Sequence, residues 1–506
     1  MKNYPLARFK RKRGDMDLIP SKTLQSRPGS GFVWTSLILV LLCLGVFYLR
    51  GLDAWLINDD EGSFLYQVWR MSEGEAPYQD FLSSRDPLFL YSGAIWMQLW
   101  GVSIVPMRGL AVCLTLGTAV LVFLLAQQTL GTDGALLSMM AFLLHPEIFR
   151  YGRAFQPEPF YLFFVVLGLY LFTLSQSRKS YVYAAFAGLV FALATLYKLL
   201  SILAFGGCVL FLLAKAWRNR SALRQVIVEG LWLVVSFGIV FGVVMIAFIL
   251  WVPGFYEGVI GLNLAQGSDL SLFQVLSKGL LFVVGYGLSF APLVLLALPA
   301  AWQAWAGRLR LPLAWQLPTA FAFTILSRAL FPRLLYYLVP SLVILFIISI
   351  RPLRGLEHYK HFYYLLIGVV LIPWAVYNAQ WSTLSEDSTL EVVRYIQAAT
   401  GPQDYVISDY QELNFHARRA STYFGAEISY VIVDGGTITG EKLIAEIEAL
   451  DVQLIVMDIA PEEGHQLIRL NDYEVFQAYL DSHFVLLDVL PRSTQRLAIY
   501  RKLDSE

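Results

Sequence analysis

Three consecutive acids, Asp59, Asp60 and Glu61, lie in a segment whose other charged residues include Arg70 and Arg85. A carboxylate beside positive charge suits glycosyl transfer, in which an acceptor oxygen loses a proton while a phosphate leaves the sugar. A positioned general base contributes roughly 10²- to 10⁴-fold to the rate of such a step. Arginine suits the departing phosphate because its planar guanidinium donates two hydrogen bonds at once. The segment therefore predicts a base beside a phosphate pocket.

Ionisable residues also interrupt apolar sequence further along the chain. Lys198 follows a run of apolar residues, and Arg153 and Glu158 flank Pro157 between two such runs. A charge in this position is costly without a partner, although each one singly fits a side chain that reaches the interface from a helix end. Together they predict an anion site near one membrane surface. The cations of this group are Arg108, Arg150, Arg153, Lys198, Arg328 and Arg333.

The composition excludes an ordinary soluble protein. Of the 506 residues, 57% are hydrophobic and 15% are charged, and the mean hydropathy is +0.58, so lipid must cover much of the surface. The 38 basic and 38 acidic residues balance, and no overall basicity points to nucleic acid. Cys43, Cys113 and Cys208 lie in apolar runs without the spacing of metal ligands, and we expect them to be small core residues.

Apolar runs predict a polytopic α-helical membrane protein with about 11 transmembrane helices, because one crossing needs about 20 apolar residues. The run at 86–100 is shorter and begins at Asp-Pro, so we expect it to lie at the membrane interface. The expected transmembrane helices cover 32–50, 104–126, 133–149, 157–174, 181–197, 199–214, 226–252, 279–304, 313–330, 334–350 and 361–379.

Basic residues predict which side of the membrane each turn faces. Eight Lys and Arg among the first 30 residues precede the first apolar run, which indicates a cytoplasmic amino terminus in the cell (inner or plasma) membrane. The turns that then fall in the cytoplasm collect further basic residues, with the turn at 127–132 as the exception. These residues are Arg178, Lys179, Lys215, Arg218, Arg220, Arg224, Arg308, Arg310, Arg351, Arg354 and Lys360.

The same topology divides the chain into three parts. Residues 1–31 form a basic cytoplasmic tail, and 32–379 form the transmembrane domain with its first extracytoplasmic loop at 51–103. Residues 380–506 form a small extracytoplasmic α/β domain, to which we assign no chemistry because no GxGxxG or GxxxxGK(S/T) motif occurs. Patterning predicts helices at 386–399, 440–450 and 472–481 and strands at 405–408, 453–457, 484–490 and 496–501.

Aromatic residues alternate with the charges of the first loop. This pattern is typical of a short amphipathic helix that lies in the headgroup layer, and a solvated loop with an aromatic belt is the simpler alternative. The aromatic residues are Trp55, Phe64, Tyr66, Trp69, Tyr78 and Phe81.

The stretch from Asp59 to Tyr91 resembles a known family. It reads DDEGSFLYQVWRMSEGEAPYQDFLSSRDPLFLY and is similar to the first extracytoplasmic loop of bacterial family 39 glycosyltransferases. These enzymes belong to the GT-C superfamily, together with the protein O-mannosyltransferases and the aminoarabinose lipid A transferases. The tail segment HARRASTYF at 416–424 is similar to the soluble end of some members. Looser blocks of similarity are RYGRAFQPEPFYLFF at 150–164, ATLYKLLS at 194–201 and FPRLLYYLVPSL at 331–342.

The resemblance implies a GT-C fold and the transfer of a sugar from a polyprenyl-phosphate donor to a lipid, glycan or protein acceptor outside the cytoplasm. It implies Asp60 as the general base with Glu61 beside it, and Asp59 as the base if the register shifts by one. Asp59 and Asp60 could also hold a divalent cation through carboxylate oxygens. No metal site is predicted otherwise, and no cluster of His supports zinc.

The resemblance further implies that Arg85, the basic residue before Pro-Leu, contacts the donor phosphate. Lipid A transferases tend to read Lys-Pro-Pro-Leu where this chain reads Arg-Asp-Pro-Leu, so the phosphate ligand stays open. The other residues expected in the site are Lys198, Arg153, Arg108 and Arg333 for the phosphate, and Glu158, Tyr78, Asp86 and Tyr336.

Two other functions compete with glycosyl transfer. A transporter or flippase for a lipid-linked or envelope precursor also carries ionisable residues among many spans. A carrier, however, places its charges near the midplane and often has repeated halves, whereas these acids gather in one loop. The second is a non-catalytic envelope assembly protein whose outer domain binds a partner, in which Asp60→Asn would be silent. The sugar, the acceptor and the prenyl carrier depend on pocket shape, which the sequence does not specify.

Overall fold

The computed structural model describes residues 30–503 except for eight internal gaps. The expected cytoplasmic tail at 1–31 therefore lies almost entirely outside the described residues. The gaps are 54–58, 263–270, 290, 328–331, 357–358, 382–387, 461–465 and 493–494.

Between residues 30 and 381, the regular structure of the described residues is helical. The α-helices are α1 Ser30–Leu49, α2 Asp59–Ser72, α3 Pro87–Trp100, α4 Ile104–Leu144, α5 Pro146–Tyr151, α6 Pro157–Arg178, α7 Tyr181–Tyr197, α8 Ile202–Arg218, α9 Leu223–Trp251, α11 Leu272–Ser289, α12 Ala291–Trp305, α13 Gln316–Leu326, α14 Val339–Arg354 and α15 Lys360–Trp381. Shorter helical turns include η1 Leu199–Ser201, the π-helical η3 Tyr256–Gly261, η4 Pro312–Trp315 and η5 Pro332–Leu338.

The expected polytopic helical architecture is confirmed. Within the described residues, six helices are long and apolar enough to cross a membrane: Ile104–Leu144, Pro157–Arg178, Leu199–Arg218, Leu223–Trp251, Leu335–Arg354 and His361–Gln380. Four shorter apolar helices accompany them, at Val33–Leu49, Tyr181–Tyr197, Leu272–Gly285 and Leu293–Trp305. The expected helix at 279–304 corresponds to α11, which ends at Ser289, and α12, which begins at Ala291, and residue 290 between them lies outside the described residues.

The turn at 127–132 lies inside α4, where the chain changes direction at Gly131. Gly131 has φ 70° and ψ −173°, a backbone conformation that residues with a Cβ rarely adopt. Arg351 donates a hydrogen bond to the carbonyl oxygen of Thr129 at 3.0 Å, and Arg354 pairs with Asp133 at 3.0 Å. The one expected cytoplasmic turn without its own Lys or Arg is thus contacted by two arginines from the end of α14.

The C-terminal part is the expected small α/β domain, with a four-stranded sheet in the order β1-β2-β4-β3. β1 and β2 are parallel, and β4 is antiparallel to both β2 and β3. All five residues of β2 are buried, as expected for a strand whose first four residues are apolar. The elements are α16 Ser388–Ala399, β1 Val406–Ser408, α17 Gln411–Ala417, η7 Phe424–Glu427, α18 Tyr430–Asp434, α19 Gly440–Leu450, β2 Leu454–Asp458, α20 Tyr473–His483, β3 Phe484–Arg492 and β4 Gln495–Lys502.

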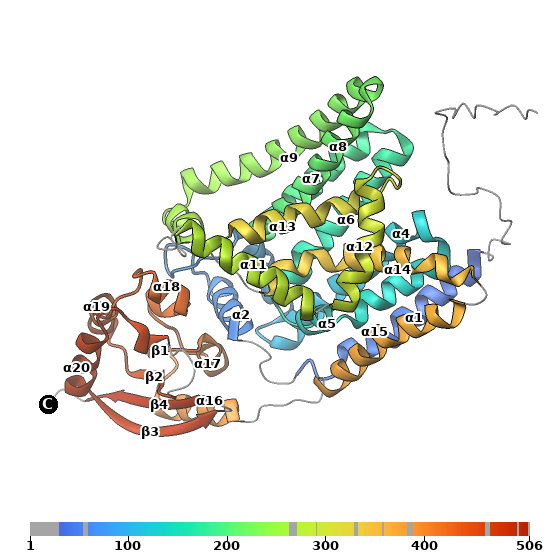
Figure 1. Ribbon diagram of the computed structural model, residues 1–506. Coiled ribbons are helices and arrows are strands. Elements are labelled where there is room, and N and C mark those ends of the chain that lie inside the picture. The colour runs from blue at the N-terminus through green and yellow to red at the C-terminus, as the bar shows by residue number, and fades with distance from the viewer. Residues whose placement is uncertain are drawn as a thin grey trace, which may run out of the picture.

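Helix α2 lies between the helical bundle and the C-terminal domain (Figure 1). It packs against α3 on one side and α17 on the other, and every residue from Glu61 to Trp69 is buried. The expected short helix is thus α2, with one face covered by α17, and its position in the headgroup layer stays a prediction. Gly62 permits this approach, since a Cβ there would lie 2.4 Å from Cβ of Glu412 on α17.

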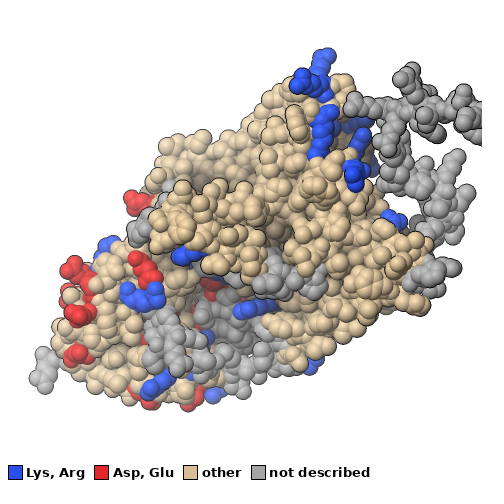
Figure 2. Space-filling model, in the orientation of Figure 1, with Lys and Arg blue, Asp and Glu red and all other residues tan. Residues whose placement is uncertain are grey.

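Charged side chains are distributed unevenly over the molecule. Figure 2 shows Lys and Arg at the end of the bundle near α8 and α9, whereas most of the Asp and Glu on the same face lie over the C-terminal domain. The two ends of the molecule are thus electrostatically different, as the distribution of basic turns predicts.

Candidate active site

Asp60 is the second residue of α2, and its carboxylate forms an ion pair with Arg333 of η5. Both side chains are partly exposed, at 30% for Asp60 and 26% for Arg333. Burial alone would raise the pKa of this carboxyl, but three neighbouring cations outweigh burial and hold the pKa below its ordinary value. They are Arg333, Arg85 and Lys198. Asp60 is therefore an ionised carboxylate surrounded by positive charge.

The side chain of Arg85, from the loop before α3, packs against the face of α2 that carries Asp60. Its guanidinium sits 4.6 Å from the ring centre of Phe64, which follows Asp60 by one helical turn. The hydroxyl of Tyr78 donates a hydrogen bond to the carbonyl oxygen of Arg85 at 2.7 Å. The side chain of Arg85 remains 23% exposed, so the cation that packs on Phe64 still reaches the surface of the site.

Lys198 and Glu158 form a second charged pair at the ends of α7 and α6. Lys198 Nζ lies 2.5 Å from Glu158 Oε1 and 5.5 Å from the ring centre of Tyr161. The Tyr161 ring packs edge-on against Tyr336 at 6.3 Å. The expected site residues Lys198, Glu158 and Tyr336 are thus neighbours of one another in the structure.

Asp86 links the loop of Arg85 to the end of α7. The backbone N–H of Leu199 donates a hydrogen bond to its carboxylate. Burial raises the pKa of Asp86 to about 7, although that hydrogen bond and the charges of Lys198 and Arg85 oppose the rise. This carboxyl therefore changes protonation near neutral pH, next to the cations of the site.

Two expected phosphate ligands, Arg108 and Arg153, are instead buried in the packing of the helices. Arg108 donates to both oxygens of Glu61, at 2.8 and 2.7 Å, and both side chains are fully buried. Arg153 donates to the carbonyl oxygens of Tyr48, at 2.9 Å, and of Arg50, at the carboxyl end of α1. A cation at that end satisfies carbonyl groups that lack partners within the helix.

Two sequence predictions are left without a described geometry. Asp59 begins α2, but its side chain lies outside the described residues, as does Arg328.

Across the parts of the chain that the structure describes, three or more His, Cys, Asp or Glu residues nowhere gather closely enough to hold a metal ion.

Sequence reasoning missed Glu427, which the C-terminal domain contributes to the site. Glu427 Oε1 lies 3.2 Å from Nε of Arg85, and its Oε2 accepts a hydrogen bond from the backbone N–H of Ser84 at 2.6 Å. The sequence placed no chemistry in this domain. The sequence signal that could have indicated Glu427 is its position, because it follows the 416–424 segment that resembles members of the family.

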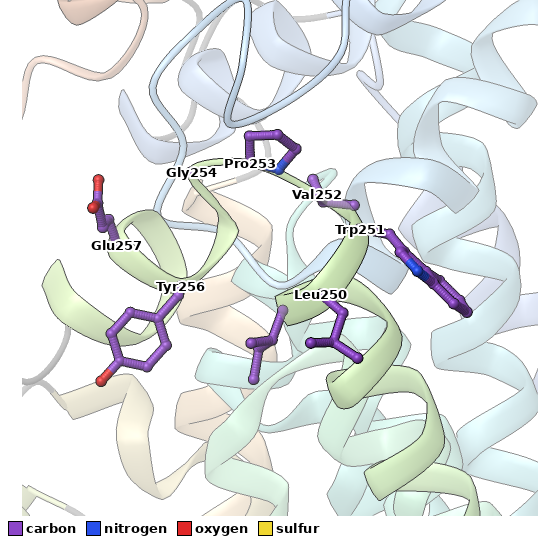
Figure 3. Close-up of a pocket in the computed structure, with 8 residues that line it drawn as sticks. Leu250, Trp251, Val252, Pro253, Gly254, Tyr256 and Glu257 are labelled. Carbon is purple, nitrogen blue, oxygen red and sulfur yellow. The ribbon is translucent and has the colours of Figure 1, made fainter.

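A hollow of about 220 Å³ lies where α9 ends and η3 begins. Figure 3 shows Tyr256 and Glu257 on one side of it and Trp251 on the other. The turn beside it packs on the loop of Arg85, since a Cβ at Gly254 would lie 2.3 Å from the carbonyl oxygen of Tyr78. The hollow therefore borders the site loop.

Comparison with known sequences finds similarity in the first half of the chain. Residues 84–251 match the family model described as dolichyl-phosphate-mannose-protein mannosyltransferase. An uncharacterized protein of Aquifex aeolicus (strain VF5) is 26% identical over 148 residues. That alignment covers 28% of this chain and 35% of the relative, so the match spans about a third of the relative's length.

Solved structures resemble nearly the whole chain. ArnT from Cupriavidus metallidurans, in the apo state and bound to undecaprenyl phosphate, superposes with a TM-score of 0.62 at 16% identity. The apo match covers 93% of this chain and 98% of ArnT. AglB from Archaeoglobus fulgidus, an archaeal oligosaccharyltransferase in complex with an inhibitory peptide and a dolichol-phosphate, gives 0.58 at 13% identity, covering 90% and 73%. The chain thus has the GT-C fold that its sequence resemblance implied.

Proposed function

We propose that this protein is a membrane glycosyltransferase that moves a sugar from a polyprenyl-phosphate donor to an acceptor on the extracytoplasmic face, with Asp60 as the general base. The observation that carries the proposal is the carboxylate of Asp60, which pairs with Arg333 and lies within the field of Arg85 and Lys198. The fold supports it, because proteins with the same fold have been solved with undecaprenyl phosphate and with a dolichol-phosphate.

In the proposed reaction, the acceptor hydroxyl oxygen attacks the anomeric carbon of the donor sugar. A bond forms between these two atoms while the bond from the anomeric carbon to the phosphate oxygen breaks. The hydroxyl proton passes to the carboxylate of Asp60. Polyprenyl phosphate leaves with the bonding electron pair, so its negative charge grows as the reaction proceeds. Preorganised cations at that position stabilise the transition state more than the ground state.

The cations have a second effect, on the strength of the base. In the free protein they hold the pKa of Asp60 low, which keeps the carboxylate ionised but makes it a weak base. A bound phosphate adds negative charge beside Arg85 and Lys198 and offsets their pull on Asp60. Donor binding therefore raises the pKa of Asp60 and strengthens the base at the step that needs it.

The test uses the purified protein in vesicles with a panel of polyprenyl-phosphate sugars labelled in the sugar, together with a membrane-lipid and cell-envelope extract. We expect the label to leave at least one donor and appear in a new product, with free polyprenyl phosphate released. Movement of intact donor across the bilayer without cleavage would instead identify a flippase. No change in any donor would contradict both activities.

A further inference from the structure

Glu427 joins the C-terminal domain to the loop that carries Arg85. Glu427 is the last residue of η7, and its side chain is 1% exposed. Its Oε2 accepts hydrogen bonds from the backbone N–H of Ser84 at 2.6 Å and from Nε2 of Gln67 at 3.2 Å. Its Oε1 accepts from the Ser84 hydroxyl and lies 3.2 Å from Arg85 Nε. A buried carboxylate with this many donors is fixed in one position, because losing them would leave its charge without compensation.

The network extends from Glu427 to the helix that carries the proposed base. Ser83 Oγ donates to Oε1 of Gln67 at 2.9 Å and accepts from the backbone N–H of Arg85 at 3.2 Å. Gln67 follows Asp60 by about two helical turns, and Phe64, which packs on the Arg85 guanidinium, lies between them. Loop 83–85 is therefore bound to the face of α2 that bears Asp60.

We infer that Glu427 is a positioning residue for the donor phosphate, which it serves by fixing the guanidinium of Arg85 beside Asp60. This inference rests on the proposed function. Glu427 pairs with Arg85 at Nε through charge, without a hydrogen bond there, so the two terminal nitrogens of the guanidinium can still bind a second anion. The ring of Phe64 and the carboxylate of Glu427 together restrict the side chain, which would otherwise lose rotamer freedom when phosphate binds. The C-terminal domain, to which the sequence assigned no chemistry, thus takes part in donor binding.

A competing role for the same pair makes the opposite prediction. If Glu427 competed with phosphate for Arg85, the pair would have to break before the donor bound, and removing the carboxylate charge would tighten binding. The variant Glu427→Gln separates the two roles. Its amide oxygen still accepts from Ser84 and its shape is nearly unchanged, but the charge that attracts Arg85 is lost.

The test titrates the full-length protein in detergent with undecaprenyl phosphate. The variants are Glu427→Gln, Arg85→Ala and the matched control Glu446→Gln, whose carboxylate accepts from the backbone N–H of Phe424 within the C-terminal domain. We expect Glu427→Gln to raise the Kd about tenfold, the effect of one charge-assisted contact. Glu446→Gln should bind like the wild type, and Arg85→Ala should bind more weakly than Glu427→Gln.

Thermal unfolding of the same samples distinguishes positioning from simple support of the fold. Positioning predicts that Glu427→Gln and Glu446→Gln unfold at similar temperatures while only the former loses affinity. Unchanged or tighter binding by Glu427→Gln, with binding lost in Arg85→Ala, would overturn the inference and leave the proposed function standing. If Arg85→Ala binds with wild-type affinity, Arg85 is not a ligand of the phosphate, and the inference fails.

Discussion

Arg108 and Glu61 form a buried two-point ion pair, in which Nε and Nη2 of the arginine donate to the two carboxylate oxygens at 2.8 and 2.7 Å. The backbone N–H of Phe155 adds a third hydrogen bond to Glu61 at 2.7 Å. Successive residues of a helix point about 100° apart, so Glu61 faces the bundle while Asp60 faces Arg333. Glu61 therefore anchors α2 to the bundle, and Asp60 is available to the site.

Glu61→Gln should therefore destabilise the protein strongly. Removing one partner of a buried ion pair leaves the other charge uncompensated, at a cost of about 3–5 kcal/mol. The measurement is the midpoint of thermal unfolding in detergent. Glu75→Gln is the control, because its pair with Arg70 is partly exposed and such pairs contribute about 1 kcal/mol or less. Equal losses in the two variants would show that Glu61 does not anchor α2.

The pH dependence of the reaction should report the cations around Asp60. A base must be ionised to act, so the rate falls as the pH drops through its pKa. Because cations hold the pKa of Asp60 below its ordinary value, the acid limb of kcat/KM should lie below about pH 3.9, the ordinary value for an aspartate. The acid limb of kcat, which reports the donor complex, should lie at higher pH than that of kcat/KM.

Arg85→Gln tests the source of this shift. Removing one cation raises the pKa of Asp60, so the acid limb of kcat/KM should move to higher pH. Arg70→Gln is the matched control, because Arg70, in the last turn of α2, pairs with Glu75 just after the helix. An acid limb that stays in place in Arg85→Gln would mean that Arg85 does not act on the base.

Gly62→Ala should loosen the C-terminal domain from α2. The added Cβ would lie 2.4 Å from Cβ of Glu412, and overpacking of this kind costs about 1–3 kcal/mol. We expect faster hydrogen exchange of the backbone amides in α17. Gly109→Ala on α4 is the control, because an added Cβ there has no described atom within 4 Å. Equal exchange in the two variants would indicate that α17 does not depend on this close approach.

The chemistry that the sequence revealed lies within one continuous segment. Asp60 and Arg85 are close enough in the chain for a motif to carry both, and in the structure Arg85 packs against the face of α2 that carries Asp60. The sequence also predicted α16, α19, α20 and the four strands of the C-terminal domain, because alternating or periodic apolar residues determine each of them locally, but it did not predict α17 or α18. The expected strand at 453–457, for example, is β2 at Leu454–Asp458.

The partners of the charged residues were not predictable from sequence. Arg108, Arg153 and Lys198 all appear in the sequence as a charge beside apolar residues. Arg108 and Arg153 nevertheless hold helices together. Which carboxylate or carbonyl each cation meets depends on tertiary packing. Glu427 illustrates this most clearly, because its contact with Ser84 spans 343 residues of sequence. No local pattern links residues that far apart.

Single-turnover cleavage of a polyprenyl-phosphate sugar by the wild type, Asp60→Asn and Asp80→Asn tests the central claim most directly. Asp80 is an exposed acid of the same loop that accepts a hydrogen bond from Ala76, so its variant controls for the loss of one negative charge. Loss of the base predicts that Asp60→Asn cleaves the donor at least about 100-fold more slowly, with Asp80→Asn near the wild-type rate. Cleavage by Asp60→Asn at the wild-type rate would contradict the assignment of Asp60 as the general base.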